Sequence, residues 1–136
     1  MTGTRAVGDM MDAALGDILA LEHMADPEAF LDSIYGFRAQ QAVEKLLKAW
    51  LDAIHAVYPR IHQIDTLLHY LSDEGIDIAG FVPLAELNSF GVQFRHDSSW
   101  RDEAPIDRSS ILEAVRALRV RVESAVAAAP ATTSGP

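Results

Sequence analysis

The sequence predicts an all-α protein, an up-and-down bundle of about five helices. Apolar residues recur every three or four positions through most of the chain, as they do on the buried face of a helix. No stretch of useful length alternates apolar and polar residues in the manner of a strand. Capping and helix-breaking residues divide the 136-residue chain into segments of helical length. This length is typical of one domain and suffices to bury a core without metals or disulfides.

The N-terminal half contains two predicted helices. Amphipathic spacing that begins at Met11 predicts a helix over about residues 8–24. Asp26-Pro27 offers an N-cap and a proline at the first helical position, so a second helix is expected over about residues 27–57. Pro59 should end it, because the residue before a proline is disfavoured in the α conformation.

Three further helices are predicted in the C-terminal half. The third is expected over about residues 61–73, with Gly75 as its stop. Residues 76–82 are expected to form a loop, and a fourth helix should run from Pro83 to about Phe94. Asp107 should cap the fifth helix. Its predicted inward face comprises Ile111, Val115, Leu118, Val122 and Val126.

Composition and charge exclude several classes of protein. The chain has no cysteine, which excludes disulfides, thiolate zinc sites and cysteine nucleophiles. No apolar run is long enough for a membrane helix, and no signal peptide is visible, so we expect a cytoplasmic protein without a membrane partner. A net charge of −9 argues against broad, non-specific binding of nucleic acids. We expect a single domain over residues 1–127 and a disordered tail over residues 128–136.

The front of the second helix carries apolar residues on a side that is polar further along. Phe30, Ile34 and Phe37 project toward the arc that later holds charged residues. Such a patch needs a partner, which could be the fifth helix or a second copy of the chain. An isologous homodimer is a common solution, so these three residues are candidates for a dimer interface.

The polar arc of the second helix is the first candidate binding surface. It contains Gln41, Glu44, Lys45 and Lys48, and the lysines could act as point charges for a phosphate or a protein partner. The alternative is a solvated face held by weak pairs such as Glu44 with Lys48. Gln40, on the apolar side, is expected to hydrogen-bond a backbone carbonyl.

His62 and Arg95 form the second candidate. A neutral imidazole at His62 could hydrogen-bond a base or a phosphate, and Arg95 could bind a phosphate with its forked guanidinium. Alternatively, His62 caps the third helix and Arg95 pairs with a nearby acid. No metal or cofactor is expected, because Pro59 separates His55 from the later histidines and no metal-ligand or nucleotide-loop motif is present.

One stretch resembles a known family. The segment 37–50, FRAQQAVEKLLKAW, resembles the signature of the HEPN domains, which reads roughly aromatic-x-A-Q-Q-A-x-E-K-x-L-K-A. His62, followed by Leu67 and Leu68, and the pair Phe94-Arg95 are similar to two further pieces of the family pattern. The resemblance covers about residues 8–125 and is strongest to small stand-alone HEPN proteins encoded beside minimal nucleotidyltransferases.

This resemblance implies a homodimeric helical bundle that binds a nucleotide or RNA, often as half of a toxin–antitoxin or nucleotidyltransferase pair. Active HEPN ribonucleases carry an arginine followed by four to six residues and a histidine, and no arginine of this chain has such a histidine. We therefore assign no catalytic residue. The expected function is binding of a nucleotide, RNA or nucleotidyltransferase at Gln41, Glu44, Lys45, Lys48, His62 and Arg95.

Two alternatives remain open. The chain could be a metal-independent ribonuclease with a degenerate site, in which His62 or His96 acts as acid and base and Arg95 stabilises the phosphorane. It could also be a structural adaptor that uses only its apolar patch.

Overall fold

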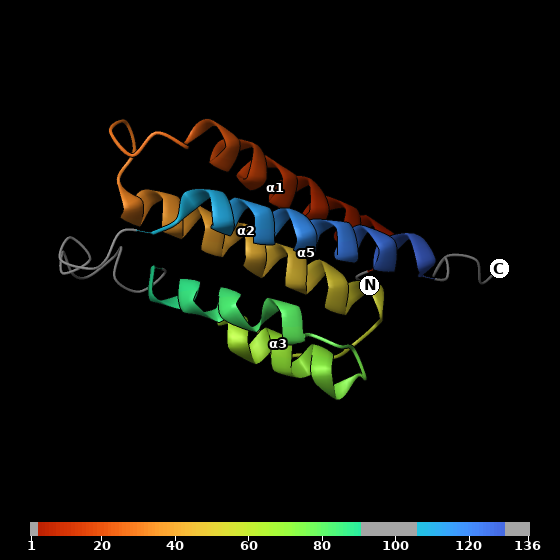
Figure 1. The fold of residues 1–136 in the computed structure, drawn as a ribbon. Coiled ribbons are helices and arrows are strands. Elements are labelled where there is room, and N and C mark those ends of the chain that lie inside the picture. The colour runs from red at the N-terminus through yellow and green to blue at the C-terminus, as the bar shows by residue number, and fades with distance from the viewer. Residues whose placement is uncertain (1–2, 91–105, 130–136) are drawn as a thin grey trace.

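The computed structural model describes residues 3–90 and 106–129, and these form an all-α bundle, as predicted (Figure 1). Side chains are described from Val7 onward. The elements in chain order are α1 (Gly3–His23), α2 (Asp32–Ala53), α3 (Ile64–Asp73), the 3₁₀ helix η1 (Ala79–Leu87) and α5 (Arg108–Ala128). None of the described helices is long and apolar enough to cross a membrane.

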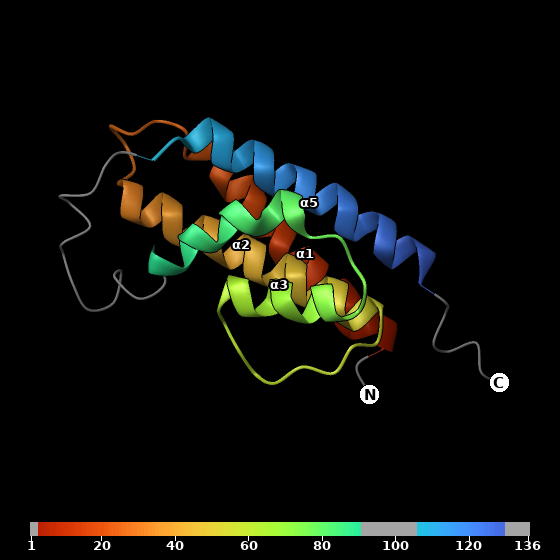
Figure 2. The same cartoon turned by 60° about the horizontal axis from the view of Figure 1, so that its bottom comes forward.

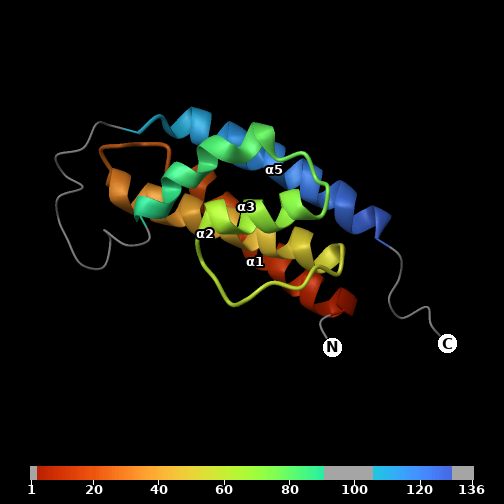
Figure 3. The ribbon, with the colours of Figure 1, turned by 90° about the horizontal axis from the view of Figure 1, so that it is seen from below.

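Helix α2 is the centre of the bundle, and the other four elements all pack against it. Its neighbour α1 runs in the opposite direction, and α3 runs in the same direction as α2 (Figures 1 and 2). The parallel arrangement is possible because the connection 54–63 returns along the bundle before α3 begins (Figure 3). This return passage carries His62 back to the middle of α2.

The core is continuous through all five elements. Half of its largest fully buried side chains lie on α2, which has buried residues nearly all round its circumference. The fully buried large residues are Ile18, Leu21, Tyr35, Val43, Leu46, Leu47, Trp50, Leu51, Ile64, Leu67, Leu71 and Leu118. A close-packed central helix of this kind gives the polar side chains on its surface a rigid backbone.

The predicted start of α2 at Pro27 is wrong. Asp26 instead caps a separate turn, in which its carboxylate accepts from the amide of Glu28 at 2.9 Å and its carbonyl accepts from Phe30 at 3.1 Å. The chain then extends at Leu31, the residue before the helix. Asp26 therefore acts as the cap of this single turn and not as the N-cap of α2.

The predicted end of α2 at about residue 57 is also wrong, and the helix ends four residues earlier, at Ala53. His55 adopts a left-handed conformation with φ 59°. The amides of His55 and Ala56 donate to the carbonyls of Asp52 and Leu51 at 3.1 and 2.9 Å. This is a Schellman motif, which glycine usually completes, so a histidine there gives no stop signal in the sequence. Val57 consequently lies outside the helix and is 91% exposed.

A Schellman motif also ends α3, and here the predicted stop at Gly75 is confirmed. Gly75 has φ 86° and follows the last turn, as predicted. The next element differs from the prediction, since η1 begins at Ala79 and Pro83 lies inside it rather than at its start. Asp77 explains the early start, because its carboxylate accepts from the amide of Ala79 at 3.1 Å. The predicted end near Phe94 lies outside the described residues.

Helix α5 follows the prediction closely. The carboxylate of Asp107 accepts from the amide of Ser110 at 3.1 Å, which confirms the expected cap. Val115, Leu118 and Val122 are fully buried, and the outer members of the predicted face are partly buried. In α1, by contrast, the large apolar side chain of Leu19 is 56% exposed.

Arg108 anchors the first turn of α5, a role that its sequence position did not reveal. Its guanidinium is buried and donates to the carbonyls of Met24, at 2.6 Å, and Phe30, and to the carboxylate of Asp32 at 2.8 Å. It also lies 4.9 Å from the ring centre of Tyr35, whose hydroxyl donates to the Arg108 carbonyl at 3.0 Å. One side chain thus fastens α5 to the connection between α1 and α2.

Candidate functional site

A buried carboxylate on α2 collects three hydrogen bonds. Glu44 is 7% exposed. Its Oε1 accepts from Gln40 Nε2 at 3.0 Å, and its Oε2 lies 2.9 Å from Lys48 Nζ and 2.7 Å from His62 Nδ1. Three of these residues are spaced by four along α2 and therefore share one face of the helix. We call this set the Glu44 cluster; its members are Gln40, Gln41, Glu44, Lys48 and His62.

Gln40 fastens the return connection to α2. Its amide nitrogen also donates to the carbonyl of His62 at 3.2 Å, which confirms the expected bond to a backbone carbonyl. Its amide oxygen accepts from Gln41 Nε2 at 2.7 Å. A nearly buried amide with both ends bonded gains stability and holds the backbone at His62 in place.

The electrostatics of the cluster favour an ionised Glu44. Burial raises the pKa of this carboxyl, but hydrogen bonds from His62, Lys48 and Gln40 outweigh burial and bring the pKa below its ordinary value. Lys48 is largely covered, with 13% of its side chain exposed, whereas the side chain of His62 is 69% exposed. A buried anion therefore orients an exposed imidazole through Nδ1, which makes Nε2 the nitrogen that can meet a ligand.

The predicted polar stripe is divided between two places. Gln41, Glu44 and Lys48 belong to the Glu44 cluster, but Lys45 pairs with Asp17 of α1 at 2.7 Å. Arg38 pairs with the same carboxylate at 3.0 Å. Asp17 is 4% exposed and was missed by sequence reasoning. Its spacing could have indicated burial, because Asp17 lies on the same inward face of α1 as Ala14 and Leu21.

The predicted alternative role of His62 as a cap of α3 is wrong. The first amide of α3, at Ile64, donates instead to Asn88 Oδ1 at 2.8 Å. Asn88 in turn donates to the carboxylate of Asp65 at 2.8 Å, so residues beside η1 complete this helix end. Arg95 and His96 lie outside the described residues, and their position relative to His62 stays a prediction.

The predicted apolar patch is covered in part, and its first residue, Phe30, precedes α2, which begins at Asp32. Phe30 is half-buried and packs against the core where α5 begins, and Phe37 is also half-buried. Ile34 is 38% exposed, and Leu31 beside it is 51% exposed. The exposed apolar surface is thus smaller than the sequence suggested and is centred on Ile34.

A groove of about 630 Å³ lies at the C-terminal end of α2 and shares Lys48 with the Glu44 cluster. We call it the Lys48 groove; its walls are Met10, Lys48, Asp52, His55, Ala56, Val57, Tyr58, Pro59 and Arg60. Inside it, the hydroxyl of Tyr58 donates to Asp52 Oδ1 at 3.0 Å. Burial raises the pKa of Asp52, although the Tyr58 hydrogen bond and the Lys48 charge oppose it. Burial and the neighbouring carboxylate raise the pKa of Tyr58.

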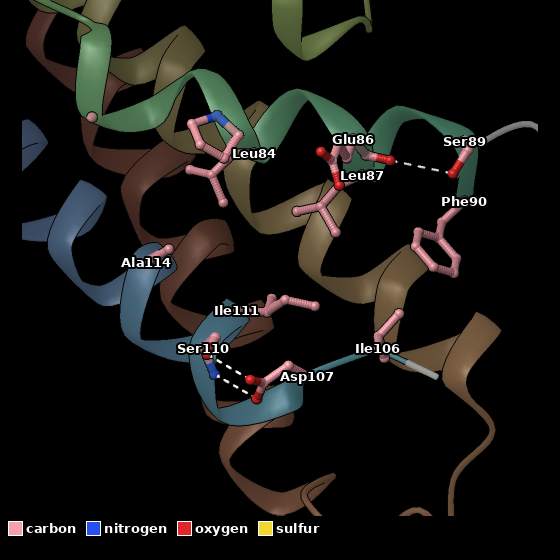
Figure 4. A pocket seen from close by; sticks show the side chains of 12 residues that line it. Leu84, Glu86, Leu87, Ser89, Phe90, Ile106, Asp107, Ser110, Ile111 and Ala114 are labelled. Carbon is pink, nitrogen blue, oxygen red and sulfur yellow. Dashed lines mark hydrogen bonds between the residues drawn. The ribbon is translucent and has the colours of Figure 1, made fainter. Parts of the chain in front are cut away.

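A second groove, of about 660 Å³, lies between η1 and α5 (Figure 4). Leu84 and Leu87 project from η1 toward Ile111 of α5, so its walls are largely apolar. Its charged lining residues are Glu86 and Asp107, and both are acidic. This groove therefore does not suit an anionic ligand.

Within residues 3–90 and 106–129, no group of three or more potential ligand side chains could hold a metal ion.

Comparisons with known proteins give one match. The family model described as the HEPN domain matches residues 9–124 of the chain. No curated protein and no solved structure matches.

Proposed function

The chain belongs to the HEPN domain family, and from this we propose that it is a non-catalytic protein that binds a nucleotide or RNA. The observation that carries the proposal is the exposed His62, held by the buried and ionised Glu44 beside Lys48. An oriented imidazole next to an ammonium group can hydrogen-bond a base edge or a phosphate. The return connection fixes this imidazole in advance, so little conformational freedom is lost on binding.

Binding without catalysis is proposed because the sequence lacks the ribonuclease motif of the family. No arginine is followed by a histidine at the required distance. The arginine–histidine pair of the active ribonucleases therefore has no counterpart in this sequence.

Fluorescence polarisation with a labelled single-stranded RNA, and calorimetry with ATP and AMP, test the proposal. The wild-type chain is expected to bind, with an affinity that falls as salt is raised. His62→Ala should weaken binding at least tenfold. His69→Ala is the matched control, since His69 is equally exposed on α3 and lies outside the cluster. Absence of binding by the wild type, or equal binding by the two variants, refutes the proposal.

A metal-independent ribonuclease is the second candidate, and the 2.7 Å contact between Glu44 and His62 favours it. In this scheme His62 Nε2 accepts the proton of a ribose 2′-hydroxyl. The 2′-oxygen bonds to the adjacent phosphorus, the bond to the 5′-oxygen breaks, and that oxygen takes a proton from water or His96. The products are a 2′,3′-cyclic phosphate and a 5′-hydroxyl.

Incubation with mixed RNA and tRNA in the presence of a chelator distinguishes the two functions. Cyclic-phosphate ends that are lost in His62→Ala or His96→Ala would establish the ribonuclease and overturn the binding-only proposal. Intact RNA that is nevertheless bound supports the binding protein.

We also propose that two copies of the chain meet at Phe30, Ile34 and Phe37. The exposed part of this surface is centred on Ile34. Light scattering after gel filtration should give a dimer for the wild type and a monomer for Ile34→Lys. Val120→Lys on α5 is the control, because Val120 is also an exposed apolar residue, 61% exposed. A monomeric wild type, or a dimeric Ile34→Lys variant, refutes the interface.

A minimal nucleotidyltransferase is the proposed protein partner, within a toxin–antitoxin-like pair. Co-expression with a nucleotidyltransferase encoded beside this chain, followed by affinity purification, tests the pairing. Co-purification that survives His62→Ala but not Ile34→Lys would identify an adaptor that uses only the apolar patch.

A further inference from the structure

We infer that the Lys48 groove holds the phosphate of a terminal nucleoside monophosphate, either a free nucleotide or the phosphorylated end of an RNA. The proposed phosphate ligands are Lys48, His55 and Arg60. This inference rests on the proposed function and gives it a second set of residues at the end of α2, which shares Lys48 with the Glu44 cluster.

The lining of the groove has more basic than acidic side chains, in an acidic chain. Lys48 and Arg60 are cationic and Asp52 is anionic, and Lys48 is also paired with Glu44 of the neighbouring cluster. The whole chain, by contrast, has a net charge of −9. Among the described residues, the side chains of Arg60 and His55 have no hydrogen-bond or ion-pair partner, so their donors are available to a ligand. By contrast, the groove between η1 and α5 is lined by two acids and no base.

Lys48 can serve the groove and the Glu44 cluster together. An ammonium group has three donors, and Glu44 Oε2 takes one of them at 2.9 Å. Tyr58 occupies one lone pair of Asp52 at 3.0 Å, which weakens the effect of the only acid in the groove. A phosphate between Lys48 and Arg60 would therefore meet two cationic side chains, one of which it shares with Glu44, and the partly satisfied carboxylate of Asp52.

The backbone at His55 supports a role in binding. Its φ of 59° lies in the left-handed region, which glycine adopts freely and which costs other residues about 1 kcal/mol or more. The side chain is exposed at the edge of the groove, so burial does not repay this cost. A hydrogen bond from the His55 imidazole to the phosphate would give a histidine a function at this position that glycine lacks.

The size and walls of the groove suit a nucleoside. Its volume of about 630 Å³ lies within the range of about 300–1,000 Å³ that is usual for small-molecule sites. Met10, Val57 and Pro59 provide apolar surface on which a base can pack. Val57 is 91% exposed, and a base packed against it would cover this apolar side chain.

Calorimetry with two pairs of ligands tests the inference: AMP against adenosine, and a 5′-phosphorylated RNA oligonucleotide against its 5′-hydroxyl form. Wild-type protein should bind the phosphorylated member of at least one pair at least tenfold more tightly. A preference confined to AMP identifies the free nucleotide, and a preference confined to RNA identifies the RNA end. Equal affinity within both pairs overturns the inference.

Two variants probe the groove without threatening the fold. Arg60→Gln and His55→Gly should each weaken binding of the phosphorylated ligand about tenfold and leave the circular dichroism spectrum unchanged. Glycine suits the backbone at position 55, so loss of binding there reports on the imidazole. Arg119→Gln, on α5 and paired with Glu123, is the control and should bind as the wild type does.

The outcomes separate this inference from the proposed function. If the wild type binds, His62→Ala loses binding, and both groove variants bind normally, the inference is overturned and the proposed function stands. If the wild type binds neither nucleotide nor RNA, both are wrong.

Discussion

The imidazole of His62 is joined to the carboxylate of Glu44 across 18 residues of sequence, with Nδ1 2.7 Å from Oε2. This contact ties the return connection 54–63 to the central helix. Glu44 is buried and His62 is exposed. The pair therefore contributes to the stability of the bundle and also orients an imidazole at its surface.

Glu44→Gln should destabilise the protein by about 1–3 kcal/mol, because the amide cannot accept from both Lys48 and His62 with a full negative charge. Urea unfolding followed by circular dichroism measures the change. Glu113→Gln on the exposed side of α5 serves as control and should alter stability by less than about 0.5 kcal/mol. A Glu44→Gln variant as stable as the control would show that the cluster contributes nothing to folding.

Stability should fall in acid, in part because of Glu44. Its pKa in the folded state lies below the ordinary value of 4.5, so the unfolded chain binds the proton more readily. The contribution of Glu44 is therefore complete above pH 4.5 and is lost as the pH falls through the folded pKa. The difference in unfolding free energy between wild type and Glu44→Gln, measured from pH 7 to 3, should shrink below pH 4.5. Subtraction cancels the contributions of other acids, including Asp52, whose raised pKa acts in the opposite direction.

Arg108→Met should cost about 2–4 kcal/mol, because the carbonyls of Met24 and Phe30 lose a charged donor that water cannot easily replace. Arg116→Met is the matched change on the same helix. Arg116 pairs with Glu22 at the surface, where such pairs contribute at most about 1 kcal/mol. Thermal unfolding of both variants ranks them, and equal melting temperatures would contradict the role of Arg108 as an anchor.

Gly36→Ala should destabilise the protein by about 1–3 kcal/mol, since a Cβ atom there would lie 2.5 Å from the ring of Phe90. Gly16→Ala on α1 has no atom within 4 Å of the added methyl group and should stabilise by about 0.5–1 kcal/mol. Denaturant midpoints of the two variants should therefore move in opposite directions. If Phe90→Ala abolishes the penalty at position 36, the clash is its cause; an undiminished penalty would point elsewhere.

His55→Gly should stabilise the chain by about 0.5–1 kcal/mol, because glycine relieves the left-handed backbone at the end of α2. Gly75→Ala, at the equivalent position after α3, should destabilise by a similar amount. Chemical denaturation of both variants checks the pair. A loss of stability in His55→Gly would mean that the imidazole contributes contacts that outweigh the backbone cost.

Much of the fold was predictable because it depends on periodic burial and local caps. The inward face of α5 and its Asp107 cap follow from spacing and from one side chain, and Gly75 marks its turn directly. The ends of α2 were not predictable in the same way. Asp26-Pro27 has the sequence pattern of a helix start, but Asp26 caps only a turn. His55 takes a left-handed conformation that its residue type disfavours.

The candidate site was predictable only in part, for a related reason. The spacing of Glu44 and Lys48 identifies a pair on one helix face, and the structure contains it. Lys45 leaves the group because its partner, Asp17, belongs to another helix. Contacts of this kind depend on how helices pack against each other, as does the role of Arg108, and residue spacing within one helix does not encode them.

The length of the passage between α2 and α3 sets the direction of the whole second half of the chain. Ten residues, 54–63, must travel back past a helix of ten residues, which is about 15 Å long. Ten fully extended residues reach at most about 35 Å, which is about twice this distance. The connection therefore tolerates insertions, and it could lose up to about half of its residues before it became too short. A link too short to span this distance could not bring His62 beside Glu44 with α2 and α3 in their present parallel arrangement.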